Sequence, residues 1–261
     1  MSTLTLTMRQ TGGIGVRHVR ALLRQPAFVM ITLVQPVIWL LLFGQLFKRV
    51  VEIPGFTGDS YITYLTPGVV VMTALFSSGW SGMSLIVEMQ RGVLNRFLVT
   101  PAPRAALTVG NVIYQGVLVL IQSAIIVALG LALGARFHGG PLALLAFALA
   151  IVLLTAAFTA FSDAIALVAR TEESVIALST FLVLPLSFLS SAFMPQTLLP
   201  GWMQVVARFN PVNWTVEVGR ETLSAGTDWT LIATRLGLLL LLAVVCTGLA
   251  TRAFRAYRRS I

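Results

Sequence analysis

The chain has 261 residues, of which 57% are hydrophobic and only 10% are charged. A globular domain in water usually carries about 25% charged residues, and the mean hydropathy of this chain is +0.91. Because the apolar residues run through the whole sequence, this composition excludes a soluble protein and predicts a polytopic membrane protein.

The positions of the basic residues decide between a membrane protein and a nucleic-acid-binding protein. The net charge is +9, with 18 Lys and Arg. With a cytoplasmic N-terminus, only six basic residues fall outside: Lys48, Arg49, Arg136, Arg208, Arg220 and Arg235. The other twelve flank the inner ends of apolar stretches, in keeping with the positive-inside rule. Since they form no single basic face, the sequence argues against nucleic-acid binding and predicts that both termini are cytoplasmic.

Six apolar stretches have about the 20 residues that a helix needs to cross a bilayer. They cover residues 26–47, 64–87, 105–134, 142–169, 175–194 and 231–250. We therefore predict an all-α, polytopic helical fold in which one transmembrane domain covers residues 1–261. Two interpretations fit residues 1–25: a basic cytoplasmic helix that lies in the inner interface, or a positive flank that only sets the topology.

Residues 88–104 form a long inside connection between the second and third stretches. Helical spacing runs from Glu88 to Leu98, and Pro101 and Pro103 then force an extended exit. A short helix held between two spans is either a docking handle for a cytosolic partner or a simple connector.

Residues 195–230 form a long outside segment that is too apolar for a disordered loop. Its three tryptophans, Trp202, Trp214 and Trp229, are expected to lie at the depth of the lipid headgroups. We expect short amphipathic helices that re-enter the outer interface before the last span. They either close the outer end of a pathway or only anchor the segment.

A few polar and small residues interrupt the apolar stretches. Asp163 is the clearest, since a carboxylate inside a membrane is costly. Pairing with an arginine of a neighbouring helix is favoured over a step in a transport path. Gln35 and Gln122 more often form hydrogen bonds between helices than contact a substrate, and Gly79 and Gly82 would permit close helix approach.

The sequence has no catalytic constellation. The only lysine is Lys48, so the chain has no phosphate-binding Gly-Lys-Ser/Thr loop. His18 and His138 fall on opposite sides of the predicted membrane, and no His-Glu-x-x-His or Gly-x-Ser-x-Gly motif occurs. We expect no metal or cofactor in this chain and no enzymatic activity by itself. If a substrate is moved, the energy comes from another subunit.

Five short motifs follow one another at corresponding places in the topology. They are Arg-Gly-Val-Leu-Asn-Arg-Phe-Leu-Val-Thr-Pro (91–101), Ala-Arg-Thr-Glu-Glu-Ser (169–174), Ser-Ala-Phe-Met-Pro (191–195), Leu-Pro-Gly-Trp-Met (199–203) and Phe-Asn-Pro-Val-Asn-Trp (209–214). In this order, and behind a basic N-terminal helix, the chain resembles the membrane subunits of type-2 ATP-binding-cassette (ABC-2 type) exporters. The resemblance covers nearly the whole chain and is greatest to drug-resistance permeases such as the membrane subunit of the daunorubicin exporter.

The resemblance implies a permease subunit that pairs with a second permease copy, identical or paralogous, and docks on two copies of a separate ATPase that binds ATP and Mg. It places ATPase coupling on Glu88, Arg91, Gly92, Asn95, Arg96, Thr100, Arg170 and Glu173. It places the outer gate or re-entrant segment on Met194, Pro195, Trp202, Asn210 and Pro211. Asp163, Gln35 and Gln122 remain candidates for the pathway or for intramembrane pairing.

The implied activity is export of a drug-like or lipid-like amphipathic substrate from the cytoplasm or inner leaflet of a bacterial cell membrane. Membrane lipids would be further partners, and nucleic acid would not. Two alternatives stay open: export of a lipid-linked polysaccharide, and a membrane scaffold or sensor partner that transports nothing.

Overall fold

The computed structural model describes residues 26–52, 60–91, 105–224 and 226–259. All regular elements in these ranges are helical, so the predicted all-α class is confirmed. The elements are α2 (Pro26–Leu46), η1 (Lys48–Glu52), α3 (Tyr61–Gly79), α4 (Gly82–Gln90), α6 (Ala105–Ala132), α7 (Gly140–Ala169), α8 (Glu172–Phe188), η2 (Gln196–Leu198), α9 (Gly201–Arg208), α10 (Pro211–Glu221) and α11 (Trp229–Arg259).

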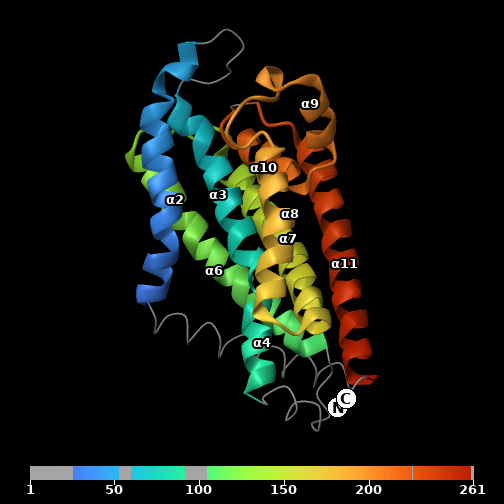
Figure 1. Ribbon diagram of the computed structural model, residues 1–261. Helices are drawn as coiled ribbons and strands as arrows, with labels where there is room; N and C mark the ends of the chain where they lie inside the picture. Colours follow the sequence, from blue (N-terminus) through green and yellow to red (C-terminus); the bar gives the residue numbers. More distant parts are fainter. Residues whose placement is uncertain (1–25, 53–59, 92–104, 225, 260–261) are drawn as a thin grey trace.

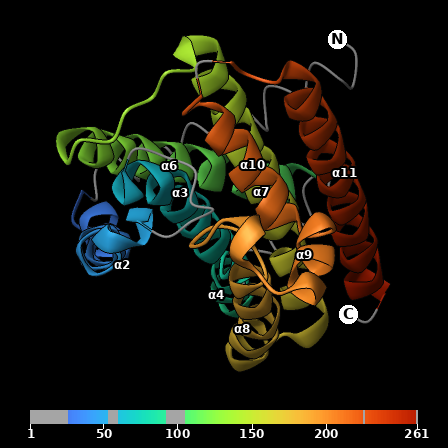
Figure 2. The same cartoon turned by 90° about the horizontal axis from the view of Figure 1, so that it is seen from above.

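The helices form one bundle with two distinct ends (Figure 1). The start of α2, the short helix α4, the α7–α8 turn and the end of α11 lie at one end. The short elements η1, α9 and α10 lie at the other. Seen along the bundle, α2 and α11 lie on opposite sides, with α7 and α10 between them (Figure 2). We call these the inner and outer ends, following the topology predicted from the arginines.

Among the described residues, four helical segments are long and apolar enough to cross a membrane: Tyr61–Gln90, Val109–Ala132, Gly140–Ala169 and Trp229–Phe254. They coincide with four of the six predicted spans. Over the other two lie α2, whose apolar part is the shorter run Met30–Leu46, and the 17-residue α8. The structure therefore describes a multi-pass membrane protein, while the count of six spans and the side on which the termini lie stay predictions.

The second and fifth predicted stretches are not helical throughout. The second stretch, 64–87, is divided into α3 and α4 at Trp80 and Ser81. The fifth stretch, 175–194, contains a helix that ends at Phe188, after which the chain leads into the outer segment without regular helix. Hydropathy detects neither the break after α3 nor the early end of α8, because the residues that follow each of them are still apolar.

Helix α7 forms the centre of the bundle because its small side chains let neighbours approach. Ala150, Ala157 and Ala160 are fully buried in it. Large apolar side chains instead cover the outward faces of α2, α8 and α11, as with Ile31 (70% exposed) and Phe181 (79% exposed). In lipid an exposed leucine costs nothing, so these helices associate through close packing and hydrogen bonds.

Three glycines show how close that packing is. A Cβ at Gly82 would collide with the backbone carbonyl of Ser162, and one at Gly130 would lie 2.7 Å from the hydroxyl of Thr66. A Cβ at Gly79 would lie 2.9 Å from a methyl group of Val183. The structure thus confirms the close approach that Gly79 and Gly82 predicted.

Candidate functional site

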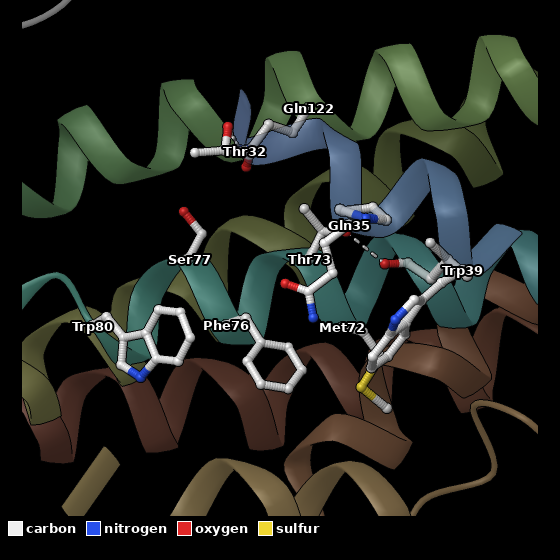
Figure 3. Close-up of a pocket in the computed structure, with 11 residues that line it drawn as sticks. Thr32, Gln35, Trp39, Met72, Thr73, Phe76, Ser77, Trp80 and Gln122 are labelled. Carbon is white, nitrogen blue, oxygen red and sulfur yellow. Dashed lines mark hydrogen bonds between the residues drawn. The ribbon is translucent and has the colours of Figure 1, made fainter. Parts of the chain in front are cut away.

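An intramembrane pocket of about 130 Å³ lies between α2, α3 and α6 (Figure 3). An apolar cavity of about 150 Å³ holds benzene, so this space is close to the size of one aromatic ring. None of the described residues that line it is charged. The pocket therefore suits an apolar group that enters from the membrane.

Two of the predicted intramembrane residues, Gln35 of α2 and Gln122 of α6, line this pocket (Figure 3). Gln122 is only 1% exposed, and its Nε2 donates to the Thr32 hydroxyl at 2.9 Å. Its carbonyl oxygen Oε1 is buried and has no hydrogen-bond partner among the described residues. A buried acceptor without a partner is costly, so a ligand that donates a hydrogen bond would bind favourably there.

Aromatic side chains build the opposite wall of the pocket. Trp39 and Phe76 meet edge to face with ring centroids 6.2 Å apart, and Phe76 and Trp80 do so at 6.0 Å. Such arrangements add to the stability of an aromatic cluster and present ring edges and faces to a planar ligand. The pocket thus combines an aromatic wall with the amides of Gln35 and Gln122, and the Gln122 Oε1 is a buried acceptor without a partner among the described residues.

The outer end of the bundle is held by the guanidinium of Arg220 in α10. Its Nη1 donates to the Ser191 hydroxyl at 2.9 Å, and its Nη2 donates to the Tyr64 hydroxyl and to the Ser191 carbonyl. Burial lowers the pKa of Arg220 below its ordinary value, and the nearby Tyr64 and Glu217 offset only part of this shift. This one side chain joins α10 to α3 and to the non-helical segment after α8.

Glu217, one turn earlier on α10, extends this network to α11. Its Oε2 accepts from Arg235 Nε at 2.6 Å, the only ion pair among the described residues. Its Oε1 accepts from Gln196 at 2.9 Å and from Asn213 at 2.8 Å. Asn213 in turn accepts from the Ser191 hydroxyl at 2.6 Å. The outer ends of α3, α10 and α11 are therefore connected through hydrogen bonds.

An open cavity of about 890 Å³ lies beside this network, and both polar and apolar residues line it. Tyr64, Gln196, Glu217 and Arg220 all contribute to it. The outer end thus offers hydrogen-bonding groups, whereas the intramembrane pocket is mainly apolar.

The predicted outer-gate residues fall into two groups. Met194 and Trp202 are exposed, at 38% and 63%, and Pro195 precedes η2. Asn210 is buried and caps two helices, because its Oδ1 accepts from the Val212 N–H while its Nδ2 donates to the carbonyls of Leu186 and Leu189. With Pro211 at the first position of α10, Asn210 holds α10 against the end of α8. The gating role of these residues stays a prediction.

The predicted ATPase-coupling residues that the structure describes share the inner end. Glu88 lies near the end of α4, and Arg91 caps it. Arg170 caps α7 in the left-handed conformation, with φ 60°, and Glu173 lies in the first turn of α8. Gly92, Asn95, Arg96 and Thr100 lie outside the described residues.

Asp163 lies apart from the pocket and is 1% exposed. It accepts a hydrogen bond from Asn111 Nδ2 of α6 at 2.8 Å. The partner seen is therefore an amide and not the arginine that the sequence suggested. An amide donor satisfies a buried carboxyl oxygen without bringing a second charge into the membrane.

Sequence reasoning missed the aromatic wall and the Arg220 network. Tryptophan and phenylalanine in apolar spans carry no signal of their own, because aromatic residues are common on lipid-facing surfaces. Asn213, Glu217 and Arg220 had a detectable signal, since their i, i+4, i+7 spacing gives one polar helix face within an apolar segment.

Comparison with known proteins identifies the family. Residues 9–224 match the model of the ABC-2 type transporter family. The chain is 33% identical over 211 residues to a protein of Porphyra purpurea named as a transport permease, ycf38, covering 79% of this chain and 70% of that one. It is 30% identical over 200 residues to the daunorubicin resistance ABC transporter permease protein DrrB1 of Streptomyces coeruleorubidus, covering 75% and 68%. The chain therefore belongs to the ABC-2 type transporter family and is an ABC transporter permease subunit.

Proposed function

We propose that this permease subunit exports a small, mainly apolar molecule that carries a hydrogen-bond donor, driven by ATP hydrolysis on a separate subunit. The substrate leaves the cytoplasm or the inner leaflet of the cell membrane. A drug-resistance permease among the relatives supports export of a drug-like compound. The observation that carries the proposal is the unpaired carbonyl oxygen of Gln122 in the intramembrane pocket.

The lining of the pocket supports this class of ligand. Trp39, Phe76 and Trp80 favour a planar apolar group, and Gln122 Oε1 favours a hydroxyl or amine that donates to it. No charged residue among those described lines the pocket, so an ionised group would have to stay outside it. Gln35 supplies a second amide at the same pocket.

The energy source belongs to a partner in this proposal. A phosphate-binding loop needs a lysine beside the phosphates, and the chain's only lysine, Lys48, follows Phe47 and precedes Arg49. The partner ATPase, in two copies, would dock at the inner end on the 88–104 loop and the α7–α8 turn. A second permease copy completes the proposed transporter.

Export of a lipid-linked polysaccharide is the second candidate. The cavity of about 890 Å³ at the outer end favours it, because several polar and charged side chains line this cavity and hydroxyl-rich sugars need many hydrogen-bonding partners. The intramembrane pocket, at about 130 Å³, favours a small apolar group instead.

Export is tested by purifying the tagged chain from its native membrane together with any ATPase subunit that accompanies it. We expect vanadate-sensitive ATP hydrolysis and ATP-dependent uptake of daunorubicin into inverted vesicles, with one aromatic ring of the drug in the pocket and its charged amino sugar outside it. Gln122→Leu should raise the daunorubicin concentration for half-maximal uptake by about tenfold, the value of one hydrogen bond.

Gln45→Leu is the matched control, because Gln45 is exposed on α2 and does not line the pocket, and it should leave uptake unchanged. A chain that purifies without an ATPase would contradict ATP-driven export and favour a scaffold. Uptake that is unchanged in Gln122→Leu would contradict the pocket as the substrate site.

A further inference from the structure

The second membrane span is interrupted between α3 and α4 (Figure 1). Trp80 and Ser81 separate the two helices, and the span as a whole covers Tyr61–Gln90. Inside a membrane, backbone groups released by such an interruption need other partners, because there is no water to supply them. The residues that satisfy the backbone here therefore control the conformation of the break.

Two serines from neighbouring helices supply these partners. The hydroxyl of Ser162 in α7 donates to the Gly79 carbonyl at 2.6 Å and accepts from the Gly82 N–H at 3.0 Å. The hydroxyl of Ser179 in α8 donates to the same Gly79 carbonyl at 2.6 Å. Ser162 thus bridges the two sides of the break, and Ser179 holds one side to α8.

The backbone around the break forms hydrogen bonds of the 3₁₀ type, in which an N–H donates to the carbonyl three residues earlier. The Ser81 N–H donates to the Ser78 carbonyl at 3.2 Å, and the Met83 N–H donates to the Trp80 carbonyl at 3.1 Å. Such tighter turns within a helix often mark a hinge. Gly82 packs its Cα directly against the Ser162 carbonyl, where any side chain would collide. The break between α3 and α4 therefore packs against α7, the central helix of the bundle.

The break connects two regions of the proposed transporter. Trp80, within the break, lines the intramembrane pocket. Helix α4, beyond the break, ends at Gln90 and leads into the 88–104 loop. A change in the angle between α3 and α4 would consequently move the pocket wall relative to the inner end.

We infer that the α3–α4 break is a hinge and that Ser162 and Ser179 are positioning residues that hold its angle. A serine hydroxyl rotates about one bond, and the Gly79 carbonyl accepts hydrogen bonds from both serines. When the break bends, one of these hydrogen bonds can therefore be lost while the other is kept. A continuous helix would lose several backbone bonds together. Coupling between the pocket and a docked ATPase through this hinge rests on the proposed function, whereas the hinge itself does not.

The hinge is tested on the purified chain in lipid nanodiscs by electron paramagnetic resonance. Cys246 is the only cysteine, so Cys246→Ala gives a background for spin labels. Labels at the exposed positions Gln90 and Val168 report α4 relative to α7. Labels at Leu145 and Leu241, exposed on α7 and α11, form the control pair.

We expect one narrow Gln90–Val168 distance in the background chain and a second population in Ser162→Ala/Ser179→Ala. Loss of the three interhelical hydrogen bonds that the two serines form should change the ratio of the two populations by about twentyfold. The control pair should not change. A double variant with the same distance distribution as the background chain would overturn the assignment of the two serines.

Two further variants separate positioning from simple loss of a buried hydroxyl. Ser123→Ala is the matched control, because Ser123 is buried in α6 and its hydroxyl has no partner among the described residues; it should not broaden the distribution. Ser179→Thr keeps the hydroxyl donor, so this variant should show the same narrow Gln90–Val168 distance as the background chain. If the double variant does not fold, Ser179→Ala keeps the Ser162 bridge and should give a smaller second population; no change in that variant would count against the hinge.

A second experiment addresses coupling in the complex with the co-purified ATPase. Trapping with ATP and vanadate should shift the Gln90–Val168 distance but not the control pair. The serine double variant should hydrolyse ATP with a lower ratio of daunorubicin transported per ATP. An unshifted distance in an active complex would overturn coupling through the hinge, whereas absence of ATP-dependent uptake in the background chain would overturn the proposed function alone.

Discussion

Arg220 in α10 lies over the ring of Tyr64 in α3, with its guanidinium carbon 4.1 Å from the ring centroid. The two residues are 156 positions apart in the chain. The same guanidinium donates to the hydroxyl and carbonyl of Ser191. A buried cation that is stacked and hydrogen-bonded in this way fixes the orientation of α10 at the outer end.

Arg220→Met should therefore destabilise the outer end strongly. The change removes a cation–π contact and several charge-assisted hydrogen bonds, which together predict a loss of about 3 kcal/mol. Thermal unfolding in detergent measures the effect as a lower Tm. Arg208→Met, an exposed arginine on α9, is the control and should leave the Tm within error. Equal Tm values for the two variants would show that the Arg220 network contributes no stability.

Gly82→Ala should disrupt the packing of α4 on α7. The added Cβ would collide with the Ser162 carbonyl, so one helix must shift, at a cost of about 1–3 kcal/mol. The matched control is Gly237→Ala in α11, where nothing lies within 4 Å of a new Cβ. The fraction of monodisperse protein after heating compares the two variants. Tolerance of Gly82→Ala equal to that of Gly237→Ala would contradict the close approach of α4 and α7.

Asp163 should act through its hydrogen bond from Asn111 rather than as a step in transport. Asp163→Asn keeps an acceptor for Asn111, so ATP-dependent daunorubicin uptake should persist in this variant. Asp163→Leu leaves the Asn111 amide without this partner and should lower the Tm, since an unpaired buried donor costs about 1–3 kcal/mol. Loss of uptake in Asp163→Asn with an unchanged Tm would instead assign Asp163 to the pathway.

The docking role that the family resemblance implies for the 88–104 loop predicts the effect of a charge reversal. Arg96→Glu should abolish ATP-dependent export and co-purification of an ATPase, while the chain still inserts into the membrane. Arg49→Glu, in η1 at the outer end, is the control with the same change of charge. Membrane fractionation and vanadate-sensitive ATPase activity give the two readouts. Full ATPase recovery with Arg96→Glu would remove this residue from the docking surface.

The sequence already determined the class of the protein and the approximate positions of its helices. The apolar stretches, the sorting of the arginines and the glycines at 79 and 82 each reflect a local requirement of a helix in lipid. The order of the short motifs from Arg91 to Trp214 also pointed to the family that comparison then confirmed.

The candidate site was predicted only in part. Gln35 and Gln122 stood out as polar residues in apolar spans, and the structure places both at one pocket. Asp163 stood out for the same reason, yet it bonds to Asn111 elsewhere in the bundle. A polar residue in a span reveals that a partner is needed but not which helix supplies it.

Only the tertiary structure decided which residues meet. Both the lipid-facing and the protein-facing sides of a span are apolar, so hydropathy does not tell how each helix is rotated in the bundle. The break at Trp80 and Ser81 was likewise invisible, because its backbone is satisfied by Ser162 and Ser179 from two other helices. Contacts of this kind depend on helix rotation and crossing angle, which arise only when all the helices pack together.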